Sequence, residues 1–206
     1  MGRIQRSGGV ALLVVLGLTG AHSVAAQVIG RPWTPAYRFG AGYVVDAPRM
    51  MTGGGLFGIT PLFGGLGLYV DLKAGGNSPR SKSNFDATVT AQQVDDQRGD
   101  IFFTNQSVWR SFNVALIRPV TSELMLYVGG GWANRSDFKE YFDPQKVRGD
   151  LGYYWVEDAR TSGGQANVMA GMLVRFGSNL NTMFGFETAP KGFTVGVFLT
   201  FPGAPG

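Results

Sequence analysis

The stretch Leu66-Gly67-Leu68-Tyr69-Val70-Asp71-Leu72-Lys73 alternates strictly between aliphatic side chains and residues of other kinds. Successive side chains of a β-strand point to opposite faces, so this alternation predicts a strand with one wholly apolar face. Leu66, Leu68, Val70 and Leu72 share that face, and Gly67, Tyr69, Asp71 and Lys73 share the other.

The same alternation recurs along most of the chain. It is clear in 165–176 (QANVMAGMLVRF) and in 193–201 (FTVGVFLTF), and weaker elsewhere. The sequence thereby predicts eight strands, at about 36–46, 52–60, 65–74, 107–118, 123–134, 165–176, 179–188 and 193–201. Each approaches the roughly 9 to 11 residues with which a tilted strand crosses a bilayer.

The connections between these segments differ in length by position. The connections after the second, fourth and sixth segments are short, whereas those after the third and fifth cover about 75–106 and 135–164. The brief first and seventh connections fall on the same side as the long ones. Long loops at one end and short turns at the other are typical of an up-and-down barrel.

Alternation by itself fits both a membrane barrel and a soluble lipocalin-like barrel with an apolar interior. The face opposite the aliphatic one is rich in Gly, as at Gly171 and Gly196, which a water-facing surface does not need but a crowded small-barrel interior does. Turning Lys73 and Arg175 towards lipid would cost about 2 to 4 kcal/mol each near the midplane. We therefore predict an all-β fold, an eight-stranded antiparallel up-and-down transmembrane β-barrel with its apolar face outward.

The N-terminus has the features of an export signal. Arg3 and Arg6 precede the apolar run Val10–Leu18, and Val24-Ala25-Ala26 offers small residues for cleavage. We expect residues 1–26 to be a cleaved signal peptide and 27–206 to be the outer-membrane barrel domain, with termini periplasmic and long loops extracellular.

The mature composition excludes several kinds of site. The single histidine, His22, lies in the expected signal and the chain has no Cys, which excludes His- or Cys-based nucleophiles, Cys/His metal sites and disulfides. Without Arg3 and Arg6 the charge falls to +2, with no basic run, so no nucleic-acid partner is indicated. We expect no catalytic residue, no bound metal and no cofactor.

The inward face should carry the few charged side chains of the barrel. Buried charges must be paired and hydrogen-bonded, so we predict a polar network within the barrel, read either as a gated ion path or as a packed plug. Its expected members are Arg38, Tyr69, Asp71, Lys73, Tyr127, Gln165, Asn167, Arg175 and Glu187.

The last predicted strand carries a specific motif. Thr194-Val195-Gly196-Val197-Phe198-Leu199-Thr200-Phe201 fits the pattern of a polar residue, a Gly two positions on, a hydrophobic residue and a terminal aromatic residue. With this motif the chain resembles the small OmpA- and OmpX-like outer-membrane barrels, although Pro202–Gly206 extends beyond the usual terminal Phe. The resemblance implies outer-membrane lipid as surroundings, and recognition of Thr194, Gly196, Leu199 and Phe201 by the barrel-assembly machinery.

The long connections are where further function is expected. Segments 136–143 and 151–157 should pair as a hairpin around the turn Asp143–Lys146. Its rings are candidate contacts for a surface ligand of unknown identity, or alternatively form an interfacial girdle and loop packing; they are Phe138, Tyr141, Phe142, Tyr153, Tyr154 and Trp155. Asp95, Asp96 and Asp100 in the other loop match no EF-hand spacing.

Together these features predict a non-enzymatic integral outer-membrane protein with a structural or surface-interaction role and no open pore. The alternatives are an outer-membrane lipid-modifying enzyme, a narrow channel, or a soluble exported ligand-binding barrel.

Overall fold

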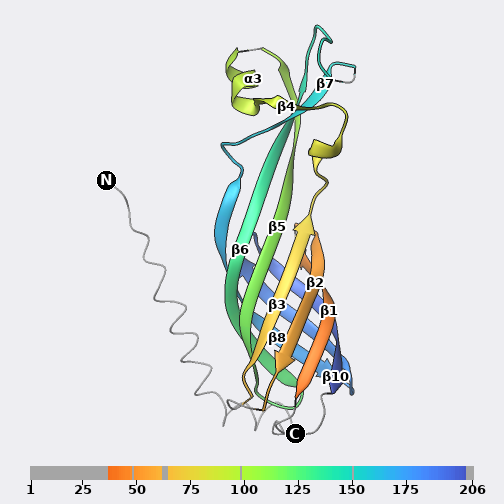
Figure 1. Cartoon of the computed structure of the whole chain (residues 1–206), viewed down its shortest axis with the longest axis vertical. Helices are drawn as coiled ribbons and strands as arrows, with labels where there is room; N and C mark the ends of the chain where they lie inside the picture. The colour runs from red at the N-terminus through yellow and green to blue at the C-terminus, as the bar shows by residue number, and fades with distance from the viewer. Residues whose placement is uncertain (1–36, 48, 62–64, 98, 150, 203–206) are drawn as a thin grey trace, which may run out of the picture.

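The computed structural model describes residues 37–47, 49–61, 65–97, 99–149 and 151–202. The expected signal peptide, residues 1–26, lies outside the described residues. Within them the chain is almost entirely β-structure, arranged as a barrel that continues at one end into a smaller folded unit (Figure 1).

Eight strands pair in sequence order and close on themselves. They are β1 (Arg38–Ala47), β2 (Met51–Ile59), β3 (Gly67–Gly75), β5 (Ile101–Pro119), β6 (Leu124–Phe142), β8 (Gly163–Phe176), β9 (Leu180–Thr188) and β10 (Lys191–Pro202). Every neighbouring pair is antiparallel, and β1 with β10 closes the cylinder. The eight-stranded up-and-down barrel predicted from the alternation is confirmed.

Two barrel strands are longer than the sequence pattern predicted. β5 begins at Ile101 rather than near 107, and β6 runs to Phe142 rather than to about 134. Their pairing continues from Pro119↔Met125 to Ile101↔Phe142, with one irregularity between Phe102 and Thr104. The polar residues of the extension do not alternate with apolar ones because this part leaves the barrel, where neither face needs to be apolar.

The extension carries a folded unit, which we call the head and define as residues 76–106 and 135–162 (Figure 1). Here β6 also pairs with β7 (Tyr153–Glu157), which pairs in parallel with β4 (Phe85–Thr90). The expected hairpin of 136–143 with 151–157 is thus present. The 3₁₀-helix η2 (Pro79–Ser81) and the helix α3 (Ala91–Gln97) complete the head. No helix among the described residues is long and apolar enough to cross a membrane.

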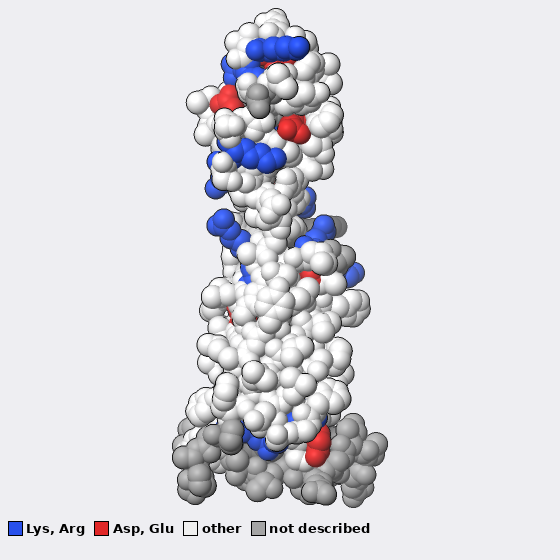
Figure 2. All heavy atoms as spheres, turned by 90° about the vertical axis from the view of Figure 1, so that its right-hand side faces the viewer, with Lys and Arg blue, Asp and Glu red and all other residues white. Residues whose placement is uncertain are grey.

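The outward face of the barrel is an apolar belt. Figure 2 shows its middle almost free of charge, with Lys and Arg over the head and at its junction with the barrel, and a smaller charged group at the opposite end. On β5 the belt lies between Arg110 and Arg118, a rise of about 27 Å along the strand and about 20 Å along the barrel axis after tilt. A closed cylinder with such a belt is a transmembrane barrel of the outer-membrane type. Its members include Tyr43, Leu56, Leu68, Leu72, Phe112, Leu116, Trp132, Val168, Met172, Phe184, Val195, Val197 and Leu199.

The barrel interior is more apolar than the glycine-rich sequence pattern suggested. Away from the head a single cluster of buried side chains fills the lumen, with Phe57, Tyr69, Tyr127 and Phe198 as its large rings. Met125, Met169, Leu173 and Met183 occupy the gaps between them, as flexible Met side chains often do in irregular cores. The Gly residues opposite make room, since a Cβ at Gly185 would meet the Tyr127 hydroxyl.

Candidate functional site

A buried polar cluster lies in the lumen at the head end of the barrel, and we call it the lumen network. At its centre the Lys73 ammonium forms an ion pair with Glu187 from the opposite side of the barrel, and Asp71 Oδ1 lies 3.8 Å from Lys73 Nζ. All three residues are at most 3% exposed. The ion pair therefore joins β3 to β9 across the interior, where it is shielded from water.

Neutral side chains complete this network. The Tyr69 hydroxyl donates to Asp71 Oδ2 at 2.9 Å, and Asn113 Nδ2 donates to Asp71 Oδ1 at 2.9 Å. Asn167 Nδ2 donates to Glu187 Oε2 at 2.8 Å, and the Thr194 hydroxyl donates to Glu187 Oε1 at 2.9 Å. Asn113 and Thr194 were not among the expected members, although both belong to the inward face of their strands and that periodicity was the available signal.

Four expected members lie outside this network. Arg38 and Arg175 are half-buried at the opposite end, where they donate to the backbone carbonyls of Ser122 and Ser178. Tyr127 stacks against Tyr69, with ring centroids 5.5 Å apart, but its hydroxyl is left without a hydrogen-bond partner. Gln165 has the inward parity, yet it is exposed because it sits at the rim where the lumen opens towards the head.

The head has its own two small cores. On one face α3 covers Tyr141 and Tyr154, packing Ala91 and Val94 against them. On the other face Phe138 and Trp155 pack with Val108 and Phe85. The hypothesis that Phe138, Tyr141, Tyr154 and Trp155 contact a surface ligand is therefore wrong, because all four are at most 4% exposed. Their large rings are what allow so small a unit to fold.

The other two rings of that set belong to an open surface, which we call the aromatic patch: Ile101, Phe103, Phe142 and Tyr153. Tyr153 packs against Phe142 and Phe103 with centroid distances of 4.9 and 5.2 Å. Ile101 and Phe103 are 57% and 60% exposed. The patch lies on the head, beyond the apolar belt, so lipid does not account for its exposure.

The patch adjoins an open strand edge. β3 pairs with β5 only as far as Gly75↔Trp109, and the described part of the chain places no strand beside residues 101–105 of β5 on that side. The segment Ile101-Phe102-Phe103-Thr104-Asn105 carries no charge and no Pro, the usual devices that protect an edge strand. This edge is available for backbone pairing.

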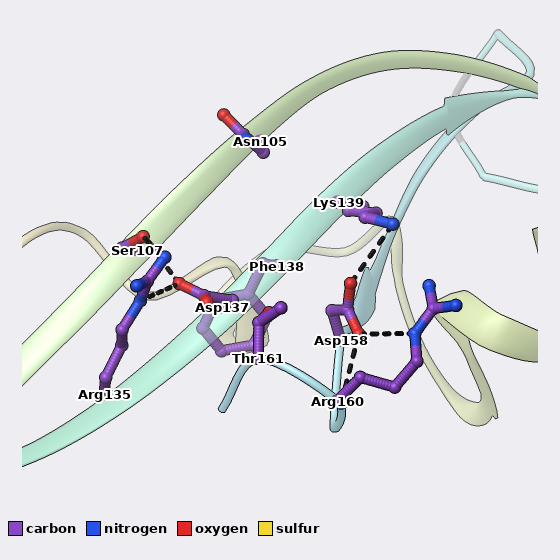
Figure 3. Close-up of a pocket in the computed structure, with 9 residues that line it drawn as sticks. All are labelled: Asn105, Ser107, Arg135, Asp137, Phe138, Lys139, Asp158, Arg160 and Thr161. Carbon is purple, nitrogen blue, oxygen red and sulfur yellow. Dashed lines mark hydrogen bonds and ion pairs between the residues drawn. The ribbon is translucent and has the colours of Figure 1, made fainter. Parts of the chain in front are cut away.

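A cavity of about 290 Å³ lies at the base of the head (Figure 3). Its charged side chains neutralise one another. Arg135 Nε lies 2.7 Å from Asp137 Oδ1, and Asp158 receives Lys139 Nζ at 3.1 Å and Arg160 Nε at 3.2 Å. Because its cations are already paired, this cavity offers no free charge to an ionic ligand.

These ion pairs make the head sensitive to acid. Burial opposes ionisation of Asp158, but hydrogen bonds from Arg160 and Lys139 outweigh it and hold the pKa of Asp158 below its ordinary value of 3.8. A lowered folded-state pKa stabilises the folded head fully above the ordinary value, and the contribution disappears as the pH falls through the lowered value.

We expect β7 amides to lose protection from hydrogen exchange between about pH 4 and pH 2, after correction for intrinsic exchange. Asp158→Asn should reduce this dependence, whereas Asp96→Asn, which deletes an exposed carboxylate from α3, should preserve it. Equal protection of wild-type β7 at both ends of this range would contradict the assignment.

The residues of the expected assembly motif all lie on β10. Thr194 and Gly196 face the lumen, while Leu199 and Phe201 are 54% and 56% exposed on the belt. Val44 and Phe198 fill the space beside Gly196, so a Cβ there would collide with both. The motif thus forms one wall of the seam with β1 that closes the barrel.

The described residues contain no group of three or more His, Cys, Asp or Glu side chains able to hold a metal ion.

No family model matches the sequence, and no curated protein matches it. Among the solved structures that resemble this chain are two small barrels. One is Ail, the attachment invasion locus protein of Yersinia pestis, at 9% identity and a TM-score of 0.45, covering 82% of this chain and 98% of that chain. The other is the N-terminal β-barrel domain of Pseudomonas aeruginosa OprF, at 13% identity and a TM-score of 0.39, covering 82% and 98%. The likeness is one of fold. Neither protein lends a residue role or a ligand to this chain.

Proposed function

We propose that this protein is an outer-membrane anchor that presents a polypeptide-binding surface outside the cell, with neither an open pore nor an enzymatic role. The observation that carries the proposal is the exposed aromatic patch beside an unpaired edge of β5, on a head raised beyond the belt. The lumen filled by side chains supports the absence of a pore.

An extended polypeptide segment is the ligand that this geometry favours. A free edge recognises such a segment by adding it as a further strand, with backbone hydrogen bonds supplying affinity and flanking side-chain contacts supplying specificity. Ile101 and Phe103 project from the edge itself, and Tyr153 extends the same apolar face. Because the edge is uncharged, we expect it to select segments with alternating apolar residues.

The orientation follows from the same proposal. We place the head and the long connections outside the cell and both chain termini in the periplasm, after export directed by residues 1–26. During biogenesis, Thr194, Gly196, Leu199 and Phe201 would be the residues that the barrel-assembly machinery reads on β10, with outer-membrane lipid around the finished belt.

The test uses the full-length mature protein in lipid nanodiscs, panned against a phage-displayed library of random 12-residue peptides. We expect enriched peptides to alternate apolar residues and to lose about tenfold or more in affinity for Phe103→Ser/Tyr153→Ser, since truncating central aromatic anchors typically costs over 1 kcal/mol. Val147→Ser, which removes an exposed apolar side chain elsewhere on the head, should bind as wild type. Enriched peptides that bind the double variant equally, or no enrichment over empty nanodiscs, would refute the proposal.

A further inference from the structure

The head-side boundary of the belt carries exposed basic side chains that have no carboxylate partner among the described residues. They are Arg49 in the turn between β1 and β2, Arg110 on β5, and Lys191 at the start of β10, and we call them the basic collar. All three are exposed. Among the described residues none of them forms an ion pair with a carboxylate, whereas Arg80, Arg135, Lys139, Arg148 and Arg160 all do.

The positions of the collar relative to the belt are consistent. Arg110 has outward parity on β5, two residues before the exposed belt residue Phe112. Lys191 likewise points outward on β10, two residues before the exposed Phe193. Phe193 packs on Phe186 with ring centroids 5.7 Å apart. Each cation thus lies directly above an aromatic side chain of the belt, at the level where hydrocarbon gives way to headgroups.

Arg49 is held at this level by its contact with Trp109. Its guanidinium carbon lies 5.6 Å from the ring centroid of Trp109, which packs with Met51, Ala133 and Ala189 over the lumen. Stacking on Trp109 holds the Arg49 guanidinium beside this ring, and Arg49 is still an exposed residue. The collar therefore follows the barrel wall from β10 through β1, β2 and β3 to β5.

We propose that the basic collar binds the phosphate groups of phosphorylated lipids in the leaflet nearest the head. The belt fixes the depth of the collar, and the absence of carboxylate partners leaves its donors free for an anion. Arginine and lysine are the side chains that bind phosphate by charge-assisted hydrogen bonds. That this leaflet is the outer one rests on the orientation given under the proposed function.

The test compares lipids that differ in phosphate content. The folded full-length mature protein in neutral detergent micelles is titrated with diphosphoryl lipid A, monophosphoryl lipid A and phosphatidylcholine, and bound lipid is measured by native mass spectrometry. We expect affinity to rise with phosphate number and to fall as salt increases. Inorganic phosphate at the same concentration should compete weakly, because it lacks the acyl chains that lie against the belt.

The decisive variant is Arg49→Gln/Arg110→Gln/Lys191→Gln. Each basic residue near an anionic lipid surface changes affinity about fivefold, so the triple variant should bind diphosphoryl lipid A roughly a hundredfold more weakly. Arg80→Gln/Lys82→Gln/Lys146→Gln removes the same charge from the head and should retain most of the affinity.

Equal loss in the two triple variants, or binding that is independent of phosphate number, would overturn the proposal. Both variants must show folded migration on an unheated gel, which separates lost binding from lost structure. Peptide binding by the aromatic patch is measured separately, so either proposal can fail while the other holds.

Discussion

Lys73→Met should destabilise the folded barrel by about 3 to 5 kcal/mol, because it leaves Asp71 and Glu187 buried without a cation. The lost contact joins β3 to β9 across the lumen, so no local rearrangement of one strand can replace it. The measurement is reversible urea unfolding in lipid vesicles, followed by heat-modifiable migration on a gel. A change below about 1 kcal/mol would contradict the assignment of Lys73 as the counter-ion of this cluster.

The companion variant Lys73→Met/Glu187→Gln identifies the cause. Glu187→Gln removes the stranded charge and keeps one acceptor oxygen for Asn167, while its new amide N–H can donate to the Thr194 hydroxyl, which accepts as well as donates. We expect the double variant to be more stable than Lys73→Met alone, which gives a coupling energy between the two residues that differs clearly from zero. Additive losses would instead point to packing of the Lys73 stem as the main contribution.

Val197→Arg should cost about 2 to 4 kcal/mol in folding free energy, since Val197 lies midway along β10 on the belt and its replacement places a guanidinium among lipid chains. The same unfolding measurement applies. Val147→Arg is the matched control, because Val147 is 79% exposed on the head and meets water in either form. Equal stability of the two variants would mean that the belt does not face hydrocarbon.

The barrel could be predicted from the sequence because lipid imposes a strict rule on every strand. Alternation such as that of Leu68 and Leu72 against Asp71 and Lys73 fixes both the strand period and the outward face, and exposures of 49% and 62% for Leu68 and Leu72 confirm it. Outside the belt this rule no longer applies. The start of β5 at Ile101 and the elements β4 and α3 therefore left no comparable pattern, and β7 was predicted from the turn at Asp143–Lys146 instead.

The interior was predicted by face but not by contact. The inward face of each strand could be read from periodicity, so Asp71, Lys73 and Glu187 could be assigned to the lumen together. Arg38 begins β1 and Arg175 lies next to the end of β8, so both lie at the end of the barrel opposite the head. Their places along the predicted strands indicate this end, and the error was to include them in one network with Lys73. Gln165 belongs to the inward face of β8 but lies at the rim, and the alternation of side chains does not distinguish the lumen from its rim.

The aromatic residues of the head illustrate a different difficulty. Tyr141, Tyr154 and Trp155 are buried because α3 and β4 cover them, and these contacts join segments about 50 or more residues apart in the chain. The local sequence around an aromatic residue in a loop does not show whether a distant segment will pack over its ring. Phe142 and Tyr153 remain at the surface only because the cover ends before the tip.

The long ladder of β5 and β6, from Pro119↔Met125 to Ile101↔Phe142 with one irregularity near its upper end, has a mechanical consequence. A tensile load applied at the tip of the head runs parallel to both strands and passes to the barrel wall through the hydrogen bonds of β5 to β3 and of β6 to β8, which are loaded together in shear instead of being peeled apart one by one. The head should therefore resist being pulled away from the barrel. Under force, the contact between the tip of the head and its bound ligand would break first.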